Sequence, residues 1–316
     1  MLRAVLLPLF TVAVAAPAFG ADIRIASWNI ANLHHQANVE QRPGIGTRRM
    51  SGDFGILNRY GRSFGRNEKP ADIIALQEIG TQQGAERIFP AQQYTVVMSK
   101  QFHRDVAASQ ANDIYTGVAI RKNRGITIVR QEDIEGLAVM HQGNLTRSGA
   151  ALLLDIAGTK LWFVSVHLKS SCSHIQGANT SSDSDCLAFW SQRVPLSNWI
   201  QQRINDGVPF VIAGDFNRRF RQFGDADPFW RAINNDDLND PILVRHPETA
   251  TRKCPTRKGA STQPIDWFVL NAGIADLVRD DSYFERRFSR PDVKATGGTN
   301  SQRLSDHCPI SIDLRF

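Results

Sequence analysis

Residues 209–217 read PFVIAGDFN, and the layout of this stretch recurs along the chain. The four apolar residues after Pro209 are typical of a short buried strand, and a carboxylate at Asp215 and an amide at Asn217 follow directly. A single Asp or Asn after a strand is most often an ordinary turn residue. The stretch therefore gains meaning only from its repetition.

Other strand candidates end in the same way. Three stretches share the layout: DIRIASWN at 22–29, DIIALQE at 72–78 and LWFVSVH at 161–167. Their last residues are an amide, a carboxylate and an imidazole: Asn29, Glu78 and His167. Two polar clusters near the carboxyl end add Asp266, Asp306 and His307. Each cluster alone is a weak signal, but together they provide the ligands and bases that phosphate chemistry uses.

The remaining pattern predicts one α+β domain over residues 21–316. Further strand candidates lie at 94–98, 116–121, 126–130, 149–156, 265–270 and 309–314, and helices are predicted at 48–64 and 187–204. Strands outnumber helices, the helices fall between groups of strands, and no Pro/Gly/Ser-rich linker separates two halves. Packed sheets in one large domain are the architecture that this order favours.

Composition excludes disorder and fibrous classes, because 42% of the residues are hydrophobic and 22% are charged. Residues 1–20 carry a charge at Arg3, an apolar run and small residues up to Gly20, which predicts a secretory signal peptide cut near Gly20. A membrane anchor is the alternative, but the apolar run is shorter than a bilayer span requires. We therefore expect a secreted or periplasmic protein without a transmembrane anchor, with a modestly basic net charge of +6 before cleavage.

The four cysteines would meet an oxidising compartment after export. Four thiols allow three pairings. We favour Cys172 with Cys186, which bracket a polar stretch, and Cys254 with Cys308. Zinc ligation is the weaker alternative, since no two cysteines have the close spacing of a zinc knuckle.

Oxygen donors dominate the polar clusters, which suits Mg²⁺ or Mn²⁺ better than zinc, with Ca²⁺ as a further candidate. The flanking residues then match a known family in order: IASWNIANL, DIIALQE, TGVAI, VSVHLKS, VIAGDFN, IDWFVLN and SDHCPI. These seven motifs, spread from about residue 22 to 316, resemble the endonuclease/exonuclease/phosphatase superfamily, which includes deoxyribonuclease I. The resemblance is to a secreted bacterial-type member. It implies a four-layer α/β/β/α sandwich of two packed mixed β-sheets with outer helices, and phosphoester hydrolysis with a divalent cation.

The resemblance also implies roles for individual residues. Glu78 resembles the principal metal ligand, with Asn29 and Asp306 beside it. Asp266 resembles the carboxylate that orients His307, the imidazole nearest the scissile phosphate. The remaining catalytic positions are Asp215 and Asn217, which position or deprotonate the attacking water, and the second imidazole, His167.

Basic residues near these motifs are candidate contacts to substrate phosphates. Arg147 lies where relatives place a phosphate-contacting arginine, and Arg218, Arg219 and Arg221 follow Asn217 directly. A solvated charged loop is the alternative for the last three. Two further basic pairs stand at 252–253 and 257–258, and the histidines outside the motifs are taken as structural or surface residues: His34, His35, His103, His141, His174 and His246.

These features predict a divalent-metal-dependent phosphodiesterase, a nuclease that hydrolyses DNA or RNA by metal- and His-assisted attack of water on phosphorus. The main alternative is a phospholipid- or inositol-phosphate-directed phosphoesterase of the same superfamily. No exposed aromatic or aliphatic hairpin for membranes is evident in the sequence, which disfavours the lipid reading. An inert binding or toxin-component protein is less favoured, because every essential position is present. We expect a monomer with a nucleic acid substrate and no protein partner.

Overall fold

The computed structural model describes residues 22–44, 47–110, 113–172, 183–234, 242–247, 254, 262–298 and 301–316. The predicted signal peptide, the basic pairs at 252–253 and 257–258, and His174 lie outside these residues. Among the described helices, none is long and apolar enough to cross a membrane.

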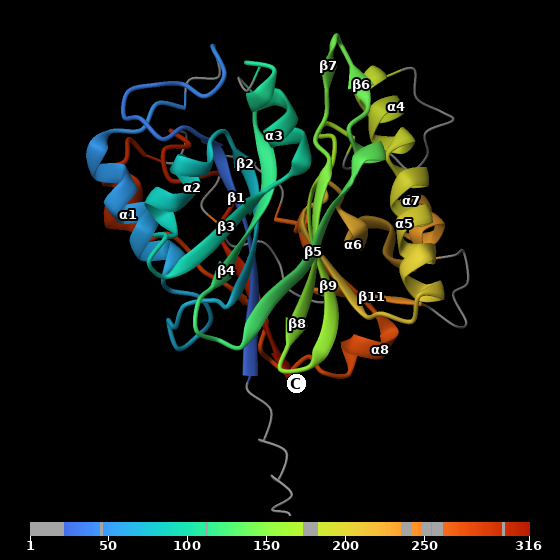
Figure 1. Cartoon of the computed structure of the whole chain (residues 1–316). Helices are drawn as coiled ribbons and strands as arrows, with labels where there is room; N and C mark the ends of the chain where they lie inside the picture. Colours follow the sequence, from blue (N-terminus) through green and yellow to red (C-terminus); the bar gives the residue numbers. More distant parts are fainter. Residues whose placement is uncertain are drawn as a thin grey trace, which may run out of the picture.

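Two mixed six-stranded sheets lie face to face in the described part of the chain (Figure 1). In spatial order the first consists of β13 (Phe284–Glu285), β14 (Ile310–Arg315), β1 (Asp22–Leu33), β2 (Ile73–Ile79), β4 (Tyr115–Arg121) and β3 (Tyr94–Met98). The second consists of β11 (Leu243–His246), β12 (Asp266–Asn271), β10 (Phe210–Asp215), β9 (Thr159–His167), β8 (Gly149–Ile156) and β5 (Ile126–Ile134). A separate hairpin joins β6 (Met140–His141) to β7 (Asn144–Leu145) at the top of Figure 1.

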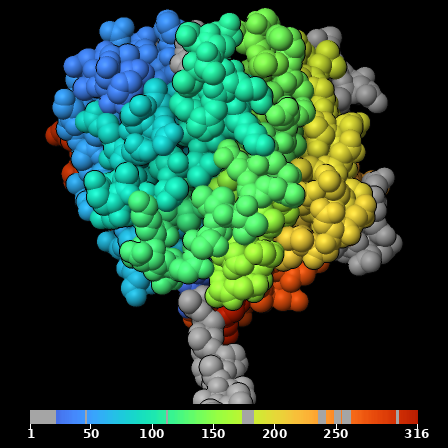
Figure 2. All heavy atoms as spheres, in the orientation of Figure 1, coloured from blue at the N-terminus to red at the C-terminus, as the bar shows by residue number. Residues whose placement is uncertain are grey.

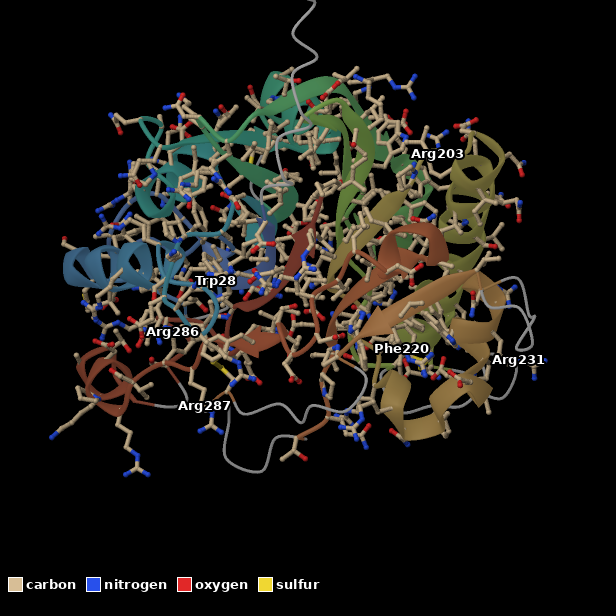
Figure 3. All side chains as sticks on the ribbon, turned by 90° about the horizontal axis from the view of Figure 1, so that it is seen from below. Trp28, Arg203, Phe220, Arg231, Arg286 and Arg287 are labelled. Atoms are coloured by element: carbon tan, nitrogen blue, oxygen red, sulfur yellow. A yellow bond between two sulfur atoms is a disulfide. The ribbon has the colours of Figure 1, made fainter. Side chains whose placement is uncertain are left out.

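Helices cover the outer faces of both sheets, so the predicted four-layer sandwich is confirmed (Figure 1). The helices are α1 (Ser51–Gly61), α2 (Gln82–Ile88), α3 (Lys100–Ala107), α4 (Ser184–Ser191), α5 (Arg193–Asn205), α6 (Phe220–Phe223), α7 (Pro228–Ile233), α8 (Ala272–Ala275) and α9 (Arg290–Ala295). Residues of α1 and α2 join one apolar cluster with the first sheet, and those of α4, α5 and α7 join another with the second. On the face shown in Figure 2, the residues coloured blue to cyan and those coloured green to yellow lie side by side. From below, Trp28 lies in the half of the first sheet and Phe220 in that of the second (Figure 3).

The face between the sheets changes from apolar to polar along each central strand. In β1, Ile23 and Ile25 belong to the inter-sheet core, and alternation places Ser27 and Asn29 on the same face. The same change occurs along four other strands: Ile73-Ala75-Gln77, Leu161-Phe163-Ser165-His167, Val211-Ala213-Asp215 and Leu270-Phe268-Asp266. The apolar ends hold the sheets together, and the polar ends gather at one edge.

A buried hydrogen-bond relay marks the transition between the two regions. The Ser27 hydroxyl donates to the Gln77 carbonyl oxygen at 3.3 Å, and the Gln77 amide donates to the Ser165 hydroxyl at 3.0 Å. The Ser165 hydroxyl in turn donates to the carbonyl of Leu76 at 2.8 Å. These residues are at most 1% exposed, so the relay satisfies polar groups that would otherwise be costly between the sheets.

The helix predicted at 187–204 is two helices that meet at Gln192. Pro195 lies in the first turn of α5, where its missing N–H needs no helical partner but prevents continuation of the preceding helix. The Gln192 side chain, between the two helices, is fully buried and forms hydrogen bonds with the backbones of Lys169 and Leu137.

Both predicted disulfides are present, and the structure describes no free cysteine. Cys172–Cys186 joins the loop after β9 to α4, and Cys254–Cys308 ends one residue beyond His307. Sequence separations are 14 and 54 residues, respectively.

Replacing either pair by alanine should lower the free energy of unfolding. The chain-entropy model gives about 3 kcal/mol for the shorter loop and about 4 kcal/mol for the longer one. Urea unfolding of the two double variants, Cys172→Ala with Cys186→Ala and Cys254→Ala with Cys308→Ala, measures both losses. A reductant should shift each variant less than the wild type; equal shifts in all three proteins would contradict a stabilising role for these bonds.

Candidate active site

Three site residues lie in one row of the second sheet. Strand register pairs His167 with Asp215 and Asp215 with Asp266. Gly214, with φ +153°, permits this close pairing, because a Cβ there would lie 2.0 Å from the carbonyl oxygen of Val166. The sheet itself therefore brings together an imidazole and two carboxylates that the sequence separates by up to a hundred positions.

Asn29 reaches this row from the first sheet. Its Nδ2 donates to Glu78 Oε1 and to Asp215 Oδ2, both at 3.1 Å, and its Oδ1 accepts from the Ala31 amide at 3.0 Å. The residue is fully buried. Asn29 thus links the carboxylates of the two sheets.

Glu78 enters the site through an irregular backbone. Strict alternation would send its side chain away from the second sheet, since its neighbour Gln77 already points there. Glu78 instead has φ +59° and lies at a register shift between β2 and β4. A left-handed non-glycine residue costs about 1–3 kcal/mol, and such strain is found at functional sites. The turned backbone lets Glu78 Oε2 accept from the Asn32 amide at 2.9 Å.

His307 completes the group from the loop before β14. Its Nδ1 lies 2.8 Å and 2.9 Å from the two Asp266 carboxylate oxygens, and its Nε2 lies 3.6 Å from Asp215 Oδ2. A carboxylate only accepts, so Nδ1 carries the proton and Nε2 faces the site. Ser305 fixes the loop, because its hydroxyl accepts from the His307 amide and donates to the carbonyl of Asn29.

Burial shapes the protonation of the site. It raises the pKa of Asp215 to about 7; His307 opposes this shift and Asp266 reinforces it. Burial also lowers the pKa of His167 well below its usual value, assisted by the charges of Arg147, His307, Arg42 and Lys169. His167 Nε2 lies 3.7 Å from Asp215 Oδ2 and 3.9 Å from Glu78 Oε1. A carboxylate with a pKa near neutrality can accept a proton, whereas the lowered pKa of His167 keeps its imidazole neutral.

Glu78 provides carboxylate oxygens beside Asn29, and such oxygens are the donor type that hard divalent cations prefer. Burial lowers the pKa of Arg49 to about 10, and the negative charges of Asp53, Glu78 and Asp306 oppose this shift. The Asn29 side-chain nitrogen donates a hydrogen bond to Glu78, and its side-chain oxygen accepts one from the backbone N–H of Ala31. Asp215, Asp266 and His307 have potential ligand atoms within 4.8 Å of one another.

Arg49 is a site residue that sequence reasoning missed. Its guanidinium donates to the carbonyls of Ile30 and Ala31 at 2.5 and 2.9 Å and to that of Arg303 at 2.9 Å. It is 2% exposed and lies behind the strand that carries Asn29. No motif marks it, since a single arginine before a helix has many ordinary explanations.

Asn217 and Arg147 lie next to the row. The Asn217 amide N–H donates to Asp215 Oδ1 at 2.8 Å, and its side chain donates to the carbonyl of Leu168 at 2.9 Å. Arg147 forms an ion pair with Asp113 at 2.6 Å and lines a cavity together with His167. The roles of both toward a substrate stay predictions.

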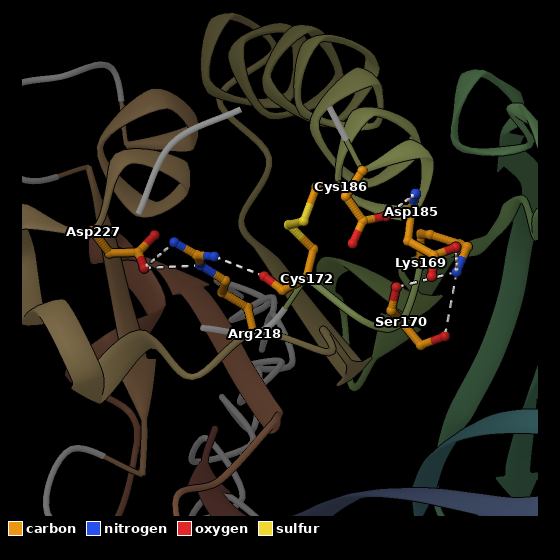
Figure 4. The surroundings of a disulfide bond; sticks show 8 residues. Lys169, Ser170, Cys172, Asp185, Cys186, Arg218 and Asp227 are labelled. Atoms are coloured by element: carbon orange, nitrogen blue, oxygen red, sulfur yellow. Dashed lines mark hydrogen bonds and ion pairs between the residues drawn. A yellow bond between two sulfur atoms is a disulfide. The ribbon is translucent and has the colours of Figure 1, made fainter. Parts of the chain in front are cut away.

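The expectation that Arg218 contacts substrate phosphate is wrong. Its side chain is fully buried and forms an ion pair with buried Asp227 at 2.9 Å, and it donates to the carbonyl of Cys172 (Figure 4). Asp227 is the N-cap of α7 and is fully buried. A buried carboxylate needs a cationic partner, and Arg218 provides it. Of the other two arginines in this run, Arg219 is half-buried and Arg221 is exposed.

A cavity of about 400 Å³ opens beside His167. Its lining includes Arg42, Asp113, Arg147, Lys169, Asp185 and four hairpin residues: His141, Gln142, Asn144 and Leu145. The hairpin also corrects the sequence interpretation, which found none: its Met140 and Leu145 are 67% and 43% exposed. Two short strands of two residues each give no periodic signal in the sequence.

Comparison with known proteins finds relatives only among solved structures; neither a family model nor a curated sequence matches the chain. An endonuclease/exonuclease/phosphatase from Bacteroides vulgatus superposes with a TM-score of 0.60 at 17% identity, covering 94% of this chain and 99% of that one. The human Nocturnin catalytic domain gives 0.54 at 15% identity, covering 93% and 94%. The mannosyl-6-phosphatase of Bacteroides thetaiotaomicron gives 0.53 at 14% identity, covering 93% and 100%.

These identities are too low to transfer a substrate, but the superpositions extend over nearly the whole described chain. The architecture implied by the seven motifs is therefore observed directly in the sheets and their order. The chain has the fold of the endonuclease/exonuclease/phosphatase superfamily.

Proposed function

We propose that the protein is a divalent-metal-dependent phosphodiesterase that hydrolyses nucleic acid. One observation carries the proposal: Glu78, Asn29, Asp215, His167 and the His307–Asp266 pair converge at one edge of the sandwich within hydrogen-bonding or near-contact distances. An ordinary turn at each strand end would give no reason for this convergence.

The cation would be held by Glu78 with Asp306 and Asn29 beside it, with Mg²⁺ or Mn²⁺ favoured by the oxygen donors. When bound, it would neutralise charge on the phosphoryl and departing oxygens. Asp215, buried and with a raised pKa, is suited to orient a water molecule and accept its proton. Asp266 holds the His307 ring so that Nε2 faces the phosphate position.

A nucleic acid substrate is supported by the positive charge around the site. Burial lowers the pKa of His167 with help from the charges of Arg147, Arg42 and Lys169, and all four side chains line the same cavity. Repeated phosphates along a polymer would use such a surface, and the predicted net charge acts in the same direction.

A lipid headgroup is the second candidate, and one observation favours it. The β6–β7 hairpin exposes Met140 and Leu145 beside the cavity, as a membrane-contacting element would. The described hairpin carries no aromatic residue, and the surrounding charges fit polyanions as well as headgroups. The nuclease proposal is therefore preferred, with export after signal-peptide cleavage supported by the two disulfides.

Removing the cation should abolish turnover. Excess chelator, or Glu78→Gln, should reduce hydrolysis of plasmid DNA below detection, because the clustered carboxylates would then repel the phosphate. The matched control is Glu135→Gln, whose carboxylate is exposed and paired with Arg104. Undiminished cleavage in chelator, with activity equal in both variants, would disprove the metal assignment.

His307→Gln should reduce kcat by about 10²- to 10⁴-fold, the range for acid–base groups, with little change in unfolding midpoint. Asp266→Asn should have a milder effect, since it disturbs only the orientation of the ring. His103→Gln, on the exposed side of α3, serves as the control. If the His307 variant kept more than about a tenth of the wild-type rate, its role would be misassigned.

Binding to nucleic acid should weaken steeply with salt. Arg221→Gln should reduce the log–log salt slope by about one if Arg221 contacts a phosphate. Arg279→Gln, which breaks only a pair with Asp22 at the opposite end of β1, should leave the slope unchanged. Assays with DNA, RNA, sphingomyelin vesicles and inositol phosphates decide the substrate class; cleavage of a lipid or inositol phosphate while DNA and RNA stay intact would overturn the proposal.

A further inference from the structure

The cavity beside His167 has one wall built around Asp113. Its carboxylate lies 2.6 Å from Arg147 and 3.7 Å from Arg42, so two guanidiniums share one acid. Arg42 is also held by Asn32, whose side-chain oxygen accepts from its Nε at 2.9 Å. The Arg42 side chain is 33% exposed. This wall therefore presents a cation whose direct pairing to the acid is loose.

The other wall is built around Asp185. Its Oδ1 lies 2.8 Å from Lys169 Nζ and 2.8 Å from His141 Nε2 (Figure 4 shows the lysine). His141 belongs to the hairpin, Lys169 to the loop after β9 and Asp185 to α4. Asp185 therefore pairs with both His141 and Lys169, and these contacts link the hairpin, the loop after β9 and α4.

Buried bonds hold the second wall in place. The Gln192 side chain accepts from the Lys169 amide at 2.8 Å and donates to the carbonyl of Leu137 at 2.7 Å. The Cys172–Cys186 disulfide ties the lysine loop to α4 next to Asp185 (Figure 4). Because Gln192 and both cysteines are fully buried, Lys169 stands on a rigid support.

The cavity is continuous with the candidate active site. His167 lines it, and the charges of Arg42 and Lys169 both reach that imidazole. Three permanently charged side chains, Arg42, Arg147 and Lys169, face two carboxylates, so the lining carries a net positive charge. Its volume is within the range of small-ligand sites.

We infer that this cavity is a subsite for a second phosphate group of the substrate, adjacent to the scissile one and held by Arg42 and Lys169, which both line it. A guanidinium and an ammonium group both donate to phosphate oxygens, and a charge-assisted hydrogen bond to a phosphate dianion is stronger than a neutral one. The inference rests on the proposed phosphodiesterase function. It narrows the substrate to phosphodiesters that carry another phosphate nearby.

The test compares thymidine dinucleotides that differ only in an added phosphate: TpT, pTpT and TpTp. The wild type should cleave at least one phosphorylated form with a kcat/KM about tenfold or more above that for TpT, mainly through KM, as expected for one charge-assisted hydrogen bond. The trinucleotide TpTpT separates the two sources of the phosphate: a gain equal to the best dinucleotide indicates a chain phosphate, and its absence indicates a terminal one.

Arg42→Gln and Lys169→Gln should each bring the ratio of phosphorylated to unphosphorylated substrate close to one. Matched controls are Arg48→Gln, an exposed neighbour paired with Glu40, and Lys160→Gln, paired with Asp155 at the far end of β9; both should keep the wild-type ratio. A ratio near one in the wild type, or a ratio that survives both cavity substitutions, would refute the subsite.

Equilibrium binding separates this inference from the proposed function. Thymidine 3′,5′-bisphosphate and thymidine 5′-monophosphate contain no phosphodiester bond, so both can be titrated calorimetrically into the wild type in the presence of Mg²⁺ without phosphodiester turnover. Tighter binding of the bisphosphate that is lost in Lys169→Gln supports the subsite even if TpT is never cleaved. Equal affinities overturn the subsite while leaving the hydrolytic function standing.

Discussion

The carboxamide of Asn29, between Glu78 and Asp215, is the contact through which the two sheets become one site. Each sheet alone supplies only part of the chemistry: Glu78 belongs to the first, and His167, Asp215 and Asp266 belong to the second. A buried amide has two donors and an acceptor that all need partners, so Asn29 specifies the distance and the register between the sheets.

Away from this contact, apolar side chains of the two sheets pack against each other and hold the sheets together. Ile23 and Ile25 on one side and Val211 and Ala213 on the other join the same inter-sheet core. The Ser27–Gln77–Ser165 relay separates that core from the site. Hydrophobic burial thus supplies stability where no chemistry is needed, and hydrogen bonds supply geometry where it is.

Charge balance around the edge explains several features together. Acids gather near Asn29, and the buried guanidinium of Arg49 offsets part of their charge from behind. On the open side, burial lowers the pKa of His167 with help from the charges of Arg147, Arg42 and Lys169, and these three side chains leave the cavity lining with a net positive charge. His167 lies near Glu78 and Asp215 and also lines the cavity, so the region proposed for the cation adjoins the region proposed for phosphate.

The sequence by itself determined the central strands, their polar ends and the α+β class, and it favoured the cysteine pairing that the structure shows. It could do so because alternation and the chemical type of a strand's last residue are local properties of the chain. It also predicted the His307–Asp266 contact, through the resemblance of ordered motifs.

Only the tertiary structure decided where the charged side chains lie. Arg218 comes directly after Asn217 in the sequence, where we expected an accessible phosphate contact. Packing instead buries its side chain against Asp227. Arg42 and Lys169 meet acids that are 71 and 16 positions away in the chain, on elements whose placement depends on the whole sandwich. The left-handed backbone conformation of Glu78 likewise could not be predicted from the sequence around it. The partner of a charge depends on long-range packing, which no local pattern encodes.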